Sequence, residues 1–129
     1  MGPSVRPGLT PVARGLLAEA RRATLATIDP HGRPRPVPVC FAVAETPGGV
    51  TIWTPLDAKP KVVADPRSLA RVRDILDRPV ATMVADRWSE DWDRLAWVRL
   101  IGDAALVEPG PDPVRHAAAV ALLRARYPQ

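Results

Sequence analysis

Two lysines in one short segment are the side chains of this chain best suited to chemistry. Lys59 and Lys61 lie in Trp53-Thr54-Pro55-Leu56-Asp57-Ala58-Lys59-Pro60-Lys61, directly after the strand-like residues 49–54, and every other cationic side chain is arginine. A lysine ammonium is a compact point charge that suits phosphate, whereas the planar arginine fork suits bidentate partners. The segment therefore predicts a phosphate-holding loop at a strand end. A solvated surface loop stiffened by proline is the alternative that the spacing leaves open.

Clustered tryptophan is the second distinctive feature. Trp88, Trp92 and Trp97 fall within ten residues, and Trp53 is the fourth tryptophan of the chain. Tryptophans gathered in this way form a core, a dimer interface or a platform for a flat ring. Core or interface is the favoured interpretation for at least two of the three.

No side chain in the sequence is a strong candidate for a catalytic group or a metal ligand. His31 lies in a predicted turn and His116 on the first turn of a predicted exposed helix, so both are expected to be solvated. The sequence lacks a Ser-His-Asp set and a GxGxxG motif, and Cys40 stands alone without a second cysteine for zinc. We therefore predict no catalytic residue and no metal site. A redox cofactor would bring its own reactivity, and the protein would need only to hold it.

Length and charge narrow the class of protein. With 129 residues, of which 47% are apolar, the chain predicts one domain over residues 1–129, with about ten flexible residues at its N-terminus. A net charge of +4 predicts an anionic partner, and the absence of a long basic run favours a local anion site over nucleic-acid binding. The sequence contains neither a signal peptide nor an 18-residue apolar run, which predicts a soluble cytoplasmic protein without membrane contact.

Local signals predict a mainly β protein with flanking helices, in the α+β class. Strands are expected at residues 24–28, 33–43, 49–54, 80–85 and 95–107, the last with a bend at Gly102, and the turn of the first hairpin at 29–32. Helices are expected to begin at Thr10-Pro11, Asp65-Pro66 and Asp112-Pro113, where a capping side chain precedes proline. The helix after Asp65 is expected to leave Arg67, Arg71, Arg73 and Arg78 in solvent. Antiparallel strands with helices beside them suggest a small barrel or a flanked sheet.

Three prolines occupy alternate positions of the second predicted strand. Successive backbone N–H groups of a strand point to opposite sides, so the donors missing at Pro34, Pro36 and Pro38 all belong to one edge. The strand can pair fully only along its other edge. We expect it at the edge of a sheet, or at a place where a ligand replaces a neighbouring strand.

Together these motifs resemble one protein family over residues 16–127. The motifs are Leu25-Ala26-Thr27-Ile28-Asp29-x-x-Gly32, Pro38-Val39-Cys40-Phe41, Ile52-Trp53-Thr54, Lys59-Pro60-Lys61 and Asp91-Trp92-x-x-Leu95-x-Trp97-Val98-Arg99-x-x-Gly102. The chain resembles the split-barrel flavin and deazaflavin oxidoreductases related to pyridoxamine 5′-phosphate oxidase, and within them the subgroup that depends on coenzyme F420. The resemblance implies an FMN-binding-type split β-barrel.

The same resemblance implies a homodimer with cofactor in a groove at the subunit interface. By position, Thr54, Lys59 and Lys61 match residues that hold the cofactor phosphate, and Trp53 belongs to the same cofactor-binding motif. Pro38 and Val39 match a strand whose backbone lies against the tricyclic ring.

The implied function is an F420-dependent oxidoreductase that passes hydride to a small conjugated organic acceptor. The alternatives are an FMN-binding protein of the pyridoxamine 5′-phosphate oxidase type and a non-catalytic flavin- or deazaflavin-binding protein. A nucleic-acid-binding module is suggested by the basic charge alone. The sequence departs from the subgroup at Asp74, where asparagine is usual, and at Gln129, after which the subgroup continues into a final strand. The second departure bears on barrel closure and on the dimer interface.

Overall fold

A computed structural model describes residues 8–56 and 65–128 of the chain. This part has an α+β fold, as predicted. Its elements are, in chain order, α1 (Pro11–Glu19), β1 (Ala23–Ile28), β2 (Pro34–Val39), β3 (Ala42–Thr46), β4 (Gly49–Trp53), the 3₁₀ turn η1 (Pro66–Ser68), α2 (Ala70–Asp77), β5 (Val80–Arg87), the 3₁₀ turn η2 (Trp92–Arg94), β6 (Ala96–Asp103) and α3 (Pro113–Arg126).

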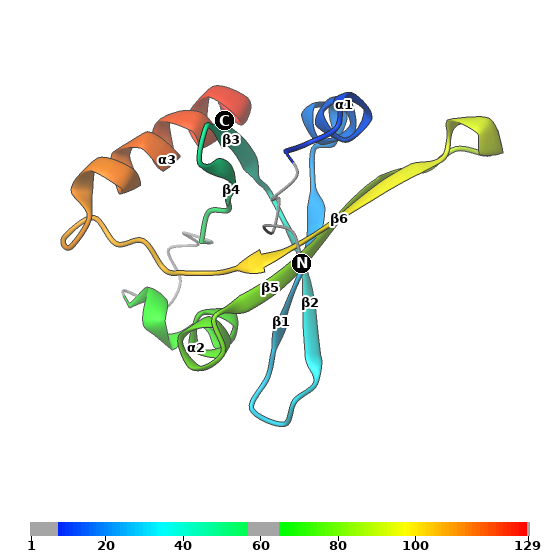
Figure 1. Cartoon of the computed structure of the whole chain (residues 1–129). Helices are drawn as coiled ribbons and strands as arrows, with labels where there is room; N and C mark the ends of the chain where they lie inside the picture. The colour runs from blue at the N-terminus through cyan, green and yellow to red at the C-terminus, as the bar shows by residue number, and fades with distance from the viewer. Residues whose placement is uncertain (1–7, 57–64, 129) are drawn as a thin grey trace, which may run out of the picture.

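The strands form two antiparallel sheets. Four strands make one sheet in the order β2-β1-β5-β6, and β3 pairs with β4 in a separate two-stranded sheet. Figure 1 shows the β1–β2 hairpin at the bottom and the long β5–β6 hairpin reaching its η2 turn at the upper right. Strand β2 is an edge strand, which confirms the prediction made from its alternating prolines.

Two of the three predicted helix starts, those of α1 and α3, are confirmed by their caps. Thr10, Asp65 and Asp112 each accept a hydrogen bond from a backbone N–H of the turn that they open. The second start differs in detail, because Asp65 opens the 3₁₀ turn η1 and α2 begins only after Leu69, whose backbone is extended. Helix α1 ends at Glu19.

One predicted strand is two strands in the structure. The expected strand over residues 33–43 breaks at Cys40 and Phe41, so that β2 and β3 belong to different sheets. The break has a tertiary cause: Phe41 is fully buried, and its N–H donates to the Tyr127 hydroxyl. The proton of this hydroxyl is directed to the Arg21 carbonyl at 2.9 Å. The last predicted strand, expected over residues 95–107, is shorter in the structure: β6 ends at Asp103, one residue after Gly102, which pairs in register with Ala81.

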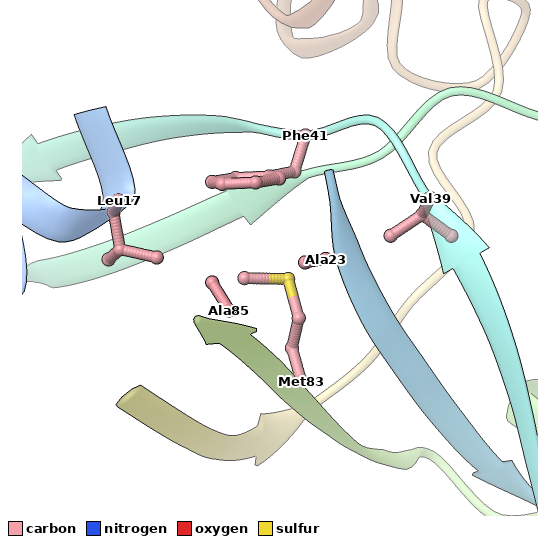
Figure 2. Close-up of a cluster of buried hydrophobic side chains, with 6 residues drawn as sticks. All are labelled: Leu17, Ala23, Val39, Phe41, Met83 and Ala85. Atoms are coloured by element: carbon pink, nitrogen blue, oxygen red, sulfur yellow. The ribbon is translucent and has the colours of Figure 1, made fainter. Parts of the chain in front are cut away.

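The core lies where both sheets meet α1. Its buried members are Leu17, Ala23, Val39, Phe41, Met83 and Ala85. Figure 2 shows them drawn from α1, β1, β5 and the β2–β3 junction, with the Met83 side chain extending toward Ala23. Apolar burial at this junction keeps the two sheets together, because full burial of a Leu, Val, Phe or Met side chain contributes about 1.5–3 kcal/mol.

The C-terminal end of α3 is fastened to α1 and to the β2–β3 junction. The Arg126 guanidinium donates to the carbonyls of Leu17 and Ala20 at the end of α1, and it lies 4.8 Å from the centroid of the Phe41 ring. Arg21 in turn donates to the Arg126 carbonyl and lies over the Tyr127 ring. These contacts satisfy carbonyls that helix ends leave without partners.

A buried carboxylate ties α2 to the β1–β2 hairpin. Asp74 is 2% exposed, and it accepts a hydrogen bond from Thr27 Oγ1 at 2.8 Å and from Arg35 Nε at 2.7 Å. Burial raises the pKa of the Asp74 carboxyl, but the two hydrogen bonds and the Arg35 charge outweigh burial, so the pKa lies below its ordinary value of 3.8. Asp74, which stands where the subgroup usually has asparagine, is therefore paired with the oppositely charged Arg35.

Candidate functional site

The end of β4 carries two of the residues predicted to bind cofactor. Trp53 is the last residue of the strand and pairs in register with Ala42, the first residue of β3. Thr54 follows directly, and both side chains are half-buried. Lys59 and Lys61 lie outside the described residues, so their role stays a prediction.

Two arginines from different helices reach the residues around this strand end. The Arg115 guanidinium of α3 lies 5.4 Å from the centroid of the Trp53 ring, within the range of cation–π attraction. Arg71 of α2 donates to the carbonyl of Pro55 at 3.4 Å and is half-buried, whereas the sequence placed it on a solvated helix face. The segment that carries the predicted lysines therefore begins between two further cations.

Sequence reasoning missed both arginines. Arg71 falls on the predicted polar face of its helix, and Arg115 follows a helix start among exposed positions, so neither pattern indicates a site. Only the packing of α2 and α3 beside β4 brings them to Trp53 and Pro55. The chemistry of arginine, which favours aromatic rings and anions, was a sequence signal for binding, but it does not say where in the fold these two residues lie.

Pro38 and Val39, predicted to face a cofactor ring, lie in different surroundings. The Val39 side chain is 7% exposed and belongs to the core (Figure 2). Its backbone pairs with Ala23 of β1, whereas Pro38 is exposed at the free edge of β2. A ligand at this edge would therefore meet the Pro38 side of the strand, and the Val39 side chain is committed to packing.

The tryptophan cluster is not a core. Trp88, Trp92 and Trp97 are 70%, 79% and 66% exposed, so the core interpretation is wrong for this chain by itself. Two of the three lie outside regular strands, around the η2 turn, while Trp97 belongs to β6. The interface and ring-platform interpretations remain.

One face of the four-stranded sheet is uncovered in the described structure, and we call it the open sheet face. Strand partners in register point to the same side of a sheet, so the register assigns this face to Thr24, Ala26, Ile28, Pro34, Pro36, Pro38, Thr82, Val84, Trp97, Arg99 and Ile101. Each of these residues is exposed or half-buried. The opposite face carries the buried Ala23, Met83 and Ala85.

The two histidines, both expected to be solvated, differ in exposure. His31 and Cys40 are exposed, and His116 is half-buried near the start of α3. Within residues 8–56 and 65–128, we find no group of three His, Cys, Asp or Glu side chains arranged to hold a metal ion.

Comparison with known proteins identifies the family of this chain. The family model for pyridoxamine 5′-phosphate oxidase matches residues 9–129. The chain belongs to the pyridoxamine 5′-phosphate oxidase family. Members of this family generally bind flavins such as FMN. No protein of curated function matches the sequence.

Solved structures of the same fold have diverse descriptions. A conserved hypothetical protein from Mycobacterium tuberculosis shares 22% identity at a TM-score of 0.68, over 98% of this chain and 69% of its own. The heme storage protein HutZ from Vibrio cholerae shares 16% identity at a TM-score of 0.66, over 94% of this chain and 77% of its own. A heme binding protein from Mycobacterium smegmatis shares 24% identity at a TM-score of 0.64, over 97% of this chain and 46% of its own. At these identities the likeness shows a common split-barrel fold.

Among the described residues, none of the helices combines the length and the apolar character that a membrane span needs.

Proposed function

We propose that this protein is an F420-dependent oxidoreductase that transfers hydride between the deazaflavin and a small conjugated organic acceptor. The observation that carries the proposal is the set of cations gathered around the end of β4. Arg115 lies on Trp53, and Arg71 donates to Pro55, at the start of the segment that contains the predicted phosphate ligands Lys59 and Lys61.

The number of cations favours F420 over FMN. FMN has one terminal phosphate, which the two lysines would be enough to bind, whereas F420 carries a phosphodiester and a glutamate tail. A ligand with several anionic groups uses the additional charges of Arg71 and Arg115, because planar guanidinium groups bind phosphate and carboxylate through paired hydrogen bonds. A site for FMN alone would not need cations from two separate helices.

The residues of this chain would bind and orient the cofactor, which supplies the hydride chemistry when bound. Trp53 and Thr54 border its phosphate end, and the β2 edge at Pro38 borders its ring. We assign no side chain as a general acid or base, since hydride transfer depends on the orientation of donor and acceptor. Substrate choice is then set by whatever space remains beside the ring.

Fluorescence titration of the purified protein with F420 and with FMN tests this proposal. We expect F420 to bind at least tenfold more tightly than FMN, which corresponds to about 1.4 kcal/mol. Tight FMN binding without F420 binding would reverse the choice of cofactor. F420 binding without turnover of any conjugated acceptor would instead favour a non-catalytic deazaflavin-binding protein. Hemin serves as a further ligand in the same titration, and a Soret shift at stoichiometric hemin would support heme binding in place of F420.

We also propose that the protein is a homodimer formed through the open sheet face. Trp97 and Ile101 on edge strand β6 are 66% and 72% exposed, which is unusual for large apolar side chains on a monomeric protein. Arg99 lies between them in sequence, with its guanidinium 6.0 Å from the Trp97 ring centroid. Aromatic residues together with arginine are enriched at interfaces between subunits.

Light scattering after size-exclusion chromatography measures the oligomeric state. The wild-type protein should show twice the monomer mass of 14.0 kDa at micromolar concentration. The Trp97→Asp/Ile101→Asp variant should show the monomer mass, because it places charges at the centre of the proposed interface. Val12→Asp is the matched control, since Val12 is 76% exposed on α1, away from that face, and should leave the dimer intact. A monomeric wild-type protein would exclude the dimer.

A further inference from the structure

The free edge of β2 offers hydrogen-bond acceptors only. In the β1–β2 ladder, Pro34, Pro36 and Pro38 pair with Ile28, Ala26 and Thr24. Proline has no N–H, so these cannot be the pairs that exchange two hydrogen bonds across the ladder. The exchanging pairs must be the intervening ones, at Arg35, Val37 and Val39.

The orientation of the proline carbonyls follows from this assignment. In an antiparallel strand, the N–H and C=O of one residue point to the same side, so residues that do not bond to β1 point their carbonyls outward. The carbonyls of Pro34, Pro36 and Pro38 therefore line the outer edge at intervals of about 6.6 Å. Between residues 34 and 39 no backbone N–H points in that direction. An ordinary edge strand would alternate donors with these acceptors.

We propose that this acceptor-only edge of β2 selects a deazaflavin ring over a flavin ring. The inference rests on the proposed function, because it takes the ring of the bound cofactor to lie against β2. The inference adds a determinant of cofactor specificity, namely the absence of N–H groups at Pro36 and Pro38. This edge ends at Val39, three residues before β3 begins.

The chemical basis is one atom of the ring. Both rings have an acceptor oxygen at C4, but oxidised flavin also has an acceptor nitrogen at position 5, which needs a donor at this edge. A 5-deazaflavin has a C–H group at position 5, which can lie against a carbonyl in a weak C–H···O contact. Facing the β2 carbonyls, the flavin nitrogen would lose its water without gaining a donor, whereas the deazaflavin carbon would lose nothing.

The sharpest test uses two ligands that differ only at this atom. FMN and 5-deaza-FMN carry the same phosphate, so the lysine segment and the arginines treat them alike. The wild-type protein should bind oxidised 5-deaza-FMN about fivefold to tenfold more tightly than oxidised FMN, the value of about one hydrogen bond. Equal binding of the two ligands would overturn the inference.

Alanine substitution supplies the missing donor. Pro36→Ala and Pro38→Ala, made separately, each add one outward N–H, and at least one should bring the ratio of the two affinities to within twofold of unity. The matched control is Pro30→Ala in the preceding turn, which adds an N–H off the β2 edge and should leave the wild-type ratio unchanged. Thermal melting of each variant verifies that it folds. A ratio that no β2 variant changes, or that Pro30→Ala changes equally, would contradict the proposal.

The two failures are distinguishable. Absence of F420 binding to the wild-type protein would remove the proposed function. F420 binding together with equal affinity for FMN and 5-deaza-FMN would leave that function standing and remove only the role of the β2 edge.

Discussion

Replacing Lys59 and Lys61 together by alanine should weaken F420 binding by at least a hundredfold. A charge-assisted hydrogen bond to phosphate contributes about 1.5–3 kcal/mol, and each 1.4 kcal/mol is a factor of about ten in affinity. Each single substitution should therefore cost roughly tenfold to a hundredfold, and the double substitution should cost more. Fluorescence titration with F420 measures the loss. Thermal melting should be unchanged, because the sequence predicts solvated lysines here and exposed charges contribute little to stability.

The choice of controls for this experiment depends on the structure. Arg71→Ala is unsuitable as a neutral control, because Arg71 donates to Pro55 beside the site and its loss should itself weaken binding. Arg73→Ala removes the same charge from the exposed face of the same helix and should leave affinity within twofold. Arginine in place of either lysine should restore binding only in part, since a planar fork does not replace a compact ammonium. A double-alanine variant that binds F420 as tightly as the wild-type protein would exclude the phosphate loop.

Among the substitutions proposed for this protein, removal of the buried Asp74 carboxylate should produce the largest loss of stability. Asp74→Ala leaves the Thr27 hydroxyl and the Arg35 guanidinium without their acceptor. Loss of one partner of a buried ion pair costs 3–5 kcal/mol, and the partial exposure of Arg35 lowers the expected cost to about 3 kcal/mol. Asp74→Asn, which keeps one acceptor oxygen, should cost about 1 kcal/mol. Urea unfolding measures both changes.

The pH dependence of this contribution has a definite sign. The folded-state pKa of Asp74 lies below its ordinary value of 3.8, so the stabilisation is fully present above that pH. It is lost as the pH falls below 3.8 through the folded-state pKa, where the carboxyl becomes protonated. The difference in unfolding free energy between wild-type protein and Asp74→Ala should therefore shrink in acid. Asp77→Ala, on the exposed face of α2, should change stability by less than about 0.5 kcal/mol at any pH.

The sequence by itself determined the local structure of this protein. Capping residues followed by proline predicted the starts of α1, of the 3₁₀ turn η1 and of α3, because these residues satisfy free N–H groups within the same turn. The Asp29–Gly32 turn was also predictable: the Gly32 N–H donates to the Asp29 carbonyl, and the Asp29 side chain accepts from two further N–H groups. The edge position of β2 followed from proline alone, since a missing N–H is a property of the residue and needs no neighbour. The motifs likewise led to the correct family.

Only the tertiary structure decided where these elements meet. The break at Cys40 and Phe41 depends on Tyr127, which is 86 residues away from Phe41 in the chain and whose hydroxyl accepts from the Phe41 N–H. The partner that holds Asp74 is Arg35, which lies on another element, and the cations around Trp53 come from α2 and α3. The exposure of Trp97 on β6 also depends on which sheet face remains uncovered. Short-range rules describe hydrogen bonds within a few residues, whereas burial and charge pairing arise from contacts between distant parts of the chain, and the candidate site consists of such contacts.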